Sequence, residues 1–130
     1  AGVLPLLVAL LRAGMEWGKA NAAVVLSELA RDAPTRMLIE DAGAPLPLIA
    51  LASPLRAGSG VDAGDNACIV LERLAADPRS RELAGEHGAA GVLAAAAFTP
   101  GCRWANNARD ALRALFSTQD DAERALGGTH

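Results

Sequence analysis

Apolar residues recur every three or four positions along most of the chain, which predicts a series of amphipathic helices. The pattern is clearest in three segments that each begin with an asparagine. Their apolar positions are Ala22, Val25, Leu26 and Leu29, then Ala67, Val70, Leu71 and Leu74, then Ala108, Ala111, Leu112 and Leu115. The β-branched and aromatic residues that strands favour are sparse, so we expect an all-α chain.

The helical pattern repeats along the chain. Residues 31–43 align with residues 76–88 without a gap, at an offset of 88 − 43 = 45 residues. The aligned pairs are Asp32 with Asp77, Arg36 with Arg81, Leu38 with Leu83, Asp41 with Glu86 and Gly43 with Gly88. A period of this length is typical of solenoids built from helical repeats.

Two further segments recur in the same frame. A short apolar segment follows Gly2, Gly43 and Gly88, and a longer one begins at Asn21, Asn66 and Asn107. The spacing from glycine to asparagine is 19, 23 and 19 residues, so the middle copy has four extra residues. We place them in a loop at 53–64, which is rich in Gly and Pro. Each unit is therefore a short helix, a Gly turn, a second helix, a loop and a longer third helix.

The expected ends of the first helices carry capping residues. Asp32 and Asp77 are suited to the N-cap, with Pro34 and Pro78 in the first turn. Gly43 and Gly88 are suited to the left-handed conformation that ends a helix.

This pattern resembles the armadillo-repeat family over nearly the whole chain. Its amino-acid sequence is most similar to plant and green-lineage members, including those fused to U-box ubiquitin ligases. The resemblance implies a right-handed α-solenoid of stacked three-helix repeats. It divides one domain, 1–130, into a partial repeat (1–41), a repeat with the longer loop (42–86), a third repeat (87–117), and the start of a further helix with a tail (118–130).

The resemblance also implies a concave face formed by the third helices. In importin-α-like members this face carries a Trp and an Asn that bind extended basic peptides. Here the Trp positions hold Val24, Ile69 and Asp110, and the Asn positions hold Glu28, Arg73 and Ala114. A nuclear-localisation-signal receptor is therefore not expected, but these six residues remain the predicted partner-binding positions. Glu28 and Arg73 either pair across the repeat interface or present charge to a partner.

Two other sets have alternative interpretations. Asn21, Asn66 and Asn107 either line the rim of the binding face or bond loop backbone near the start of the third helix. Trp17 and Trp104 fall in the loop before the third helix, where each either anchors a partner or covers the edge of the core.

Charge and length exclude several partners. The 130 residues include 12 basic and 15 acidic side chains, which gives a net charge of -3. Charges of both signs are interspersed along the chain, so no nucleic-acid partner is expected. The apolar stretch 3–11 is too short to cross a membrane, which needs about 20 residues, and no basic residue precedes it as in a signal peptide. Because Ala1 stands directly at the start of a helical pattern without a cap, we expect the chain to be part of a longer protein or a larger complex.

No residue pattern indicates catalysis, a metal or a cofactor. Cys68 lies in a helical apolar pattern and Cys102 in a loop, which favours unpaired thiols in an intracellular, cytoplasmic setting, with nuclear and ciliary alternatives. His87 and His130 are isolated, and the glycine-rich segment 58–64 lacks the Lys and the spacing of phosphate-binding loops.

The leading hypothesis is therefore a non-catalytic module that binds a protein or an extended peptide on the concave face. One alternative is a scaffold segment of a long solenoid in a large assembly such as a cilium or ribonucleoprotein. Another is the substrate-recruiting domain of a U-box-type ubiquitin ligase.

Overall fold

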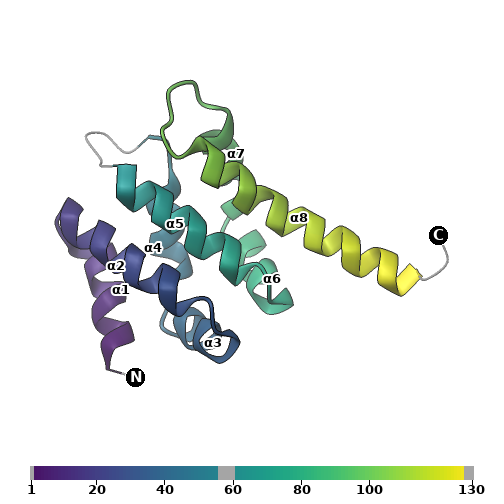
Figure 1. Cartoon of the computed structure of the whole chain (residues 1–130), viewed down its shortest axis with the longest axis horizontal. Helices are drawn as coiled ribbons and strands as arrows, with labels where there is room; N and C mark the ends of the chain where they lie inside the picture. Colours follow the sequence, from purple (N-terminus) through teal and green to yellow (C-terminus); the bar gives the residue numbers. More distant parts are fainter. Residues whose placement is uncertain (1, 56–60, 128–130) are drawn as a thin grey trace.

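A computed structural model describes residues 2–55 and 61–127, and side chains within 2–55 and 62–116 (Figure 1). Helices and connecting turns make up all of the described backbone, and it contains no strand. The helices are α1 (Val3–Ala13), α2 (Glu16–Leu29), α3 (Ala33–Asp41), α4 (Pro45–Ala52), α5 (Val61–Leu74), α6 (Pro78–Glu86), α7 (Ala89–Phe98) and α8 (Ala105–Gly127). The expected all-α class is confirmed.

The third helices of successive repeats, α2, α5 and α8, lie side by side (Figure 1). A second layer contains α1, α4 and α7, each packed against the third helix of its own repeat. The first helices, α3 and α6, precede α4 and α7, and the partial first repeat begins at α1. Each repeat thus contacts its neighbours in sequence, which is the arrangement of a solenoid.

The core runs through all repeats and consists mainly of Ala and Leu. Leu26, Leu48 and Leu93 are at most 1% exposed, and they come from α2, α4 and α7. Small residues line the close helix contacts, with Ala22, Ala67 and Ala108 all nearly inaccessible at equivalent positions of the third helices. A core with few large side chains depends on close approach of the helices.

Three of the four predicted capping residues have the expected role at a helix end, and Asp77 does not. Asp32 caps α3, since its carboxylate accepts bonds from the Thr35 backbone N–H (3.1 Å) and hydroxyl (2.6 Å). These bonds lower the pKa of Asp32, and the bond from the Thr35 hydroxyl has the larger effect. Asp77 stands at the N-cap of α6 but makes no capping bond. Gly43 and Gly88 adopt φ angles of 85° and 75°, which confirms their left-handed role.

An arginine in each first helix ties it to the end of the preceding third helix. Arg36 donates to the carbonyls of Ala30 and Arg31 at the end of α2, and Arg81 donates to that of Ala75 at the end of α5. Arg36 also bonds the Asp77 carboxylate at 3.1 Å, which explains why that carboxylate does not cap α6. Arg36 therefore joins two successive repeats.

The boundaries differ from expectation at two places. Instead of a further helix beginning at 118, α8 continues to Gly127. The first two repeats end their third helices before Pro34 and Pro78, whereas residues 116–121 contain no Pro or Gly to stop the helix. In the expected loop 53–64, residues 56–60 lie outside the described part, and α5 already begins at Val61. Asp62 therefore lies within α5 rather than in the expected loop, and Asp65 lies within the same helix.

Candidate protein-interaction face

The six predicted partner-binding residues lie on the third helices, in pairs on α2, α5 and α8. Val24 is 42% exposed, and Glu28 and Asp110 are also exposed. Ile69, Arg73 and Ala114 are partly buried. Because the three helices are neighbours, these positions form one surface, here called the third-helix face.

Glu28 and Arg73 do not pair with each other. Glu28 forms an ion pair with Arg31 one turn further along the chain (3.0 Å), and both side chains are well exposed. The Arg73 guanidinium crosses from α5 to α2, where it donates to the Ser27 carbonyl. Arg73 thus holds two repeats together. Of the two alternatives for Glu28 and Arg73, pairing with each other is not seen among the described contacts.

The three equivalent asparagines have different surroundings. Asn66 donates to the Asp62 carbonyl in the first turn of α5 (2.9 Å), which is helical backbone and not the loop backbone that was expected. Asn107 donates instead to the Asp65 carboxylate of the neighbouring helix (3.0 Å). Asn21 is exposed, and the described residues give it no hydrogen-bond partner. Repeat position alone does not determine their role, because the facing residue differs: Asp65 faces Asn107, and its counterpart in α2 is Ala20.

Asp65 is held in a partly buried site by that contact. Burial raises the pKa of this carboxyl above its ordinary value, and the Asn107 amide opposes the shift.

The two tryptophans separate into the two roles that sequence reasoning left open. Trp17 lies in the first turn of α2 rather than in a loop, and its side chain is 69% exposed. Trp104 is only 6% exposed, and its indole N–H donates to the Ala52 carbonyl at 2.7 Å. Its ring packs so closely over Gly64 that a Cβ there would overlap with it. Trp104 is therefore a core residue, and only Trp17 is accessible to a partner.

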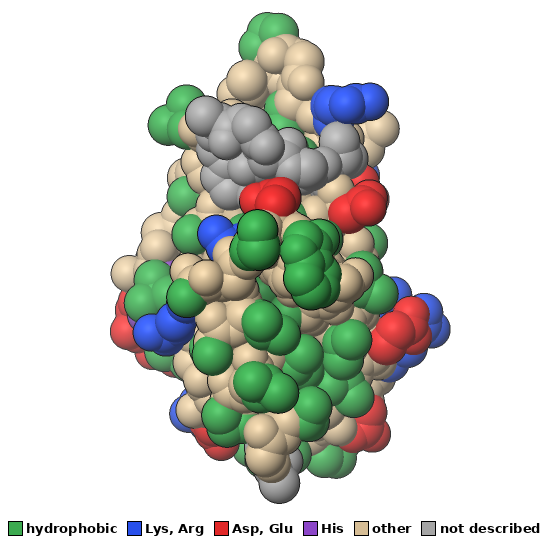
Figure 2. All heavy atoms as spheres, turned by 90° about the vertical axis from the view of Figure 1, so that its left-hand side faces the viewer, with side chains coloured by type: hydrophobic (Ala, Val, Ile, Leu, Met, Phe, Trp, Pro, Cys, Tyr) green, Lys and Arg blue, Asp and Glu red, His purple; other side chains and the backbone are tan. Residues whose placement is uncertain are grey.

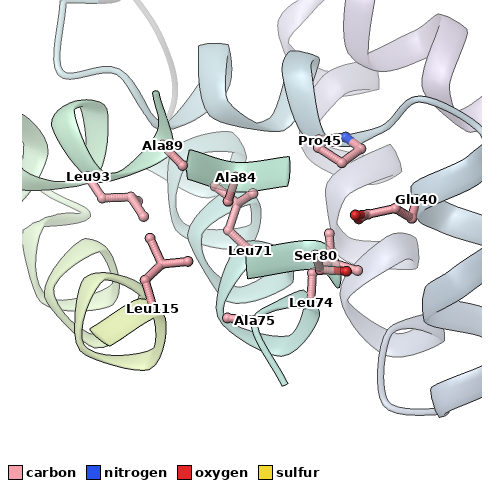
Figure 3. Close-up of a pocket in the computed structure, with 10 residues that line it drawn as sticks. All are labelled: Glu40, Pro45, Leu71, Leu74, Ala75, Ser80, Ala84, Ala89, Leu93 and Leu115. Carbon is pink, nitrogen blue, oxygen red and sulfur yellow. The ribbon is translucent and has the colours of Figure 1, made fainter. Parts of the chain in front are cut away.

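Sequence reasoning missed a buried acid, Glu40 of α3, which is 8% exposed. Its carboxylate points toward a small cavity lined mostly by apolar side chains (Figure 3). The cavity volume of 10 Å³ is about that of one water site. No described residue gives either carboxylate oxygen a hydrogen-bond partner.

The environment of Glu40 disfavours its charge. Burial raises the pKa of this carboxyl, and the nearby Ser80 hydroxyl and Arg79 guanidinium offset the effect only in part. The pattern carried no signal for this site, because the repeat counterpart of Glu40 is the exposed Gly85.

Other chemistry-bearing residues are not assembled into a site. Cys68 is fully buried, as predicted, and Cys102 is partly buried; neither forms a disulfide. Within the described residues, no group of three or more His, Cys, Asp or Glu side chains has a metal-binding arrangement. Among the same residues, no helix combines the length and the hydropathy that crossing a bilayer requires.

Comparison with known proteins yields a structural match. No family model and no curated protein matches the chain. A designed armadillo repeat protein of known structure superimposes with a TM-score of 0.75 over 88% of this chain, at 27% sequence identity. The fold is an armadillo-type α-solenoid. The chain spans about half of that designed protein, of which 47% is covered.

This match confirms the expected fold, an armadillo-type solenoid of helical repeats. It does not support the narrower resemblance to plant members. In an armadillo-type solenoid the stacked third helices form one continuous surface, and α2, α5 and α8 do so here. Such folds serve as scaffolds for protein interaction.

Proposed function

We propose that this chain is a non-catalytic protein-interaction module that binds a protein or extended peptide on the third-helix face. The supporting observation is an accessible aromatic residue next to an accessible aliphatic one. Trp17 is 69% exposed and Val24 is 42% exposed. They are seven residues apart on α2, so they lie on one side of the helix, about two turns or 10 Å apart.

The character of the face changes from α2 to α8. Apolar groups dominate on α2, whereas α8 presents Asp110, which pairs with Arg113 at 3.2 Å with both side chains about half exposed or more. Ile69 lies between these ends on α5. The proposed partner therefore places apolar side chains against α2, and its polar part lies over α8.

Trp17 is the proposed anchor, since exposed tryptophan is enriched among residues that dominate binding energy. Glu28 and the rim residue Asn21 flank the Trp17–Val24 pair on the same helix. Arg73 and Asn107 contribute indirectly, because their contacts with Ser27 and Asp65 hold the third helices in register.

The test compares proteins captured by the wild-type chain with those captured by Trp17→Ala combined with Val24→Asp. Both substitutions are at exposed positions, so the melting temperature should stay near that of the wild type. We expect the variant to bind a captured partner at least about tenfold more weakly.

The matched control is Met37→Ala combined with Leu38→Asp, which changes two exposed apolar residues on α3, away from the third-helix face. The control should retain full binding. If the α3 variant loses the partner and the α2 variant retains it, the binding surface lies elsewhere and the proposal is wrong.

A further inference from the structure

The end of the solenoid formed by α1 and α2 exposes apolar side chains, here called the N-terminal face. The face consists of Val3, Leu6 and Leu10 on α1 and Val25 on α2, which are 54%, 61%, 36% and 42% exposed. Figure 2 looks onto this side of the molecule and shows hydrophobic side chains gathered across it. This face adjoins the third-helix face, and the two surfaces meet on α2 at Asn21 and Glu28.

Three of these positions are buried in both other repeats, and the counterparts of Leu6 are the buried Pro47 and the partly buried Val92. Val25 corresponds to Val70 and Ala111, which are 0% and 1% exposed. Leu10 corresponds to Leu51 and Ala96, which are 2% and 0% exposed. The counterparts of Val3, Ala44 and Ala89, are also buried.

In the second layer, α4 packs against α1 and α7 packs against α4. Two contacts identify what covers the third-helix counterparts, Val70 and Ala111. Arg73 on α5 reaches the Ser27 carbonyl of α2, and Asn107 on α8 reaches Asp65 of α5. In both cases one edge of a third helix packs against the third helix of the preceding repeat. On α2 the equivalent edge carries Asn21, Val25 and Glu28, and nothing in the described structure covers it.

The opposite end of the solenoid has a different character. Arg109 on α8 occupies the position of the fully buried Ala23 and Cys68. Its guanidinium bonds the Ala97 carbonyl (2.9 Å) and the Asn106 side chain (3.0 Å), and it lies 5.9 Å from the centre of the Phe98 ring. A second copy stacked head to tail would bury this guanidinium against apolar groups, which is unfavourable.

We propose that the N-terminal face binds a further three-helix repeat, stacked in the register that α5 adopts on α2 and α8 adopts on α5. The third helix of that repeat carries a small residue at the position shared by Ala23 and Cys68, both of which are fully buried. A carboxylate at the position of Asp65 would accept a bond from Asn21, as Asp65 does from Asn107.

A duplication within the chain tests this proposal. Gly2, Gly43 and Gly88 occupy the same repeat position, so a second copy of residues 43–87 joined ahead of Gly2 reproduces the natural connection between His87 and Gly88. We expect one cooperative unfolding transition at a higher temperature than in the parent chain. The Val25 amide should exchange at least tenfold more slowly, because α2 becomes covered on both edges.

Charged substitutions show whether the gain depends on this face. Leu10→Glu combined with Val25→Lys should remove the gain in the extended chain and leave the melting temperature of the parent chain nearly unchanged. Leu38→Lys, at an exposed position on α3, should leave the gain intact.

Three results would overturn the proposal. The first is unchanged exchange at Val25 in a folded extended chain. The second is failure to fold of both this extension and an extension built from one repeat of the designed armadillo protein. The third is a dimer of the parent chain that Val25→Lys dissociates, since a second copy would then be the occupant.

Discussion

At the scale of single residues, the packing of Trp104 on Gly64 shows how the absence of one side chain makes room for another. Gly64 lies inside α5, where glycine costs helix stability compared with alanine. A Cβ at this position would nevertheless lie 2.7 Å from the Cε2 and Cε3 atoms of Trp104, whose indole is fixed by its bond to Ala52. The indole, rather than the conformation of the backbone, therefore requires glycine here.

Gly64→Ala should therefore destabilise the fold by about 1–3 kcal/mol through overpacking. Gly91→Ala is the matched control, because Gly91 also lies within a helix but nothing lies within 4 Å of its missing Cβ. That substitution should stabilise the chain by about 0.5–1 kcal/mol. Urea denaturation measures both, and equal effects of the same sign would contradict the packing argument.

Glu40 provides the second residue-scale prediction. The folded-state pKa of this carboxyl is raised by burial, so the carboxyl stabilises the fold most when it is protonated in both states, below about pH 4. That contribution is lost as the pH rises through the raised folded-state pKa. Glu40→Gln resembles the protonated form, and it should therefore be more stable than the wild type at pH 7.

The difference between Glu40→Gln and the wild type should shrink as the pH falls and should vanish near pH 4. Denaturant midpoints at pH 4 and pH 7 measure this dependence. Glu82→Gln, at an exposed position on α6, is the control for replacing a carboxylate by an amide. A gain for Glu40→Gln that stays constant with pH would show that charge burial is not its cause.

At the scale of helices, Arg36 connects three elements through one side chain. It bonds the end of α2, belongs to α3 and pairs with Asp77 at the start of α6, with its side chain 15% exposed. Arg79 pairs with Asp41 at 3.3 Å, but its side chain is 63% exposed. The two arginines therefore differ mainly in burial and in the backbone carbonyls that only Arg36 binds.

Arg36→Gln should destabilise the fold by about 2 kcal/mol, since it removes charge-assisted bonds at a mostly buried site. Arg79→Gln should cost less than about 0.5 kcal/mol. Thermal unfolding of the two variants in parallel measures the difference. Equal losses would show that Arg36 acts only as a surface charge.

The helix pattern was largely predictable because local signals coincide with the repeat register. Gly43 and Gly88 end the first helices, and Pro34 and Pro78 start them, as expected. The continuous α8 was not predicted, although residues 116–121 contain no proline that would end the helix. Contacts across the repeat interface were harder to predict, because Asn107 depends on Asp65, a residue 42 positions away that the first repeat replaces with Ala20.

The third-helix face was also only partly predictable from the sequence. The register identified which residues of α2, α5 and α8 share a surface, since equivalent positions lie on equivalent sides. The register did not predict that Trp17 is exposed and Trp104 buried, because the burial of each indole depends on the space opposite it. Gly64 makes that space available to Trp104.

At the scale of the whole molecule, the solenoid has no single centre, so stability should vary along its length. α5 packs against α2 on one side and α8 on the other, whereas among the residues described α2 packs mainly against one third helix, α5. Exposing the α5 backbone requires two repeat interfaces to open, and exposing the α2 backbone requires one.

Amide hydrogen exchange under native conditions should therefore reveal a gradient. The equivalent amides of Val25 on α2 and Val70 on α5 provide a matched pair, because both lie within a helix at the same repeat position. We expect exchange at Val70 to be at least about tenfold slower, since opening of α5 requires nearly global unfolding. Equal protection at the two sites would mean that the repeats unfold together as one cooperative unit, despite the linear arrangement of their contacts.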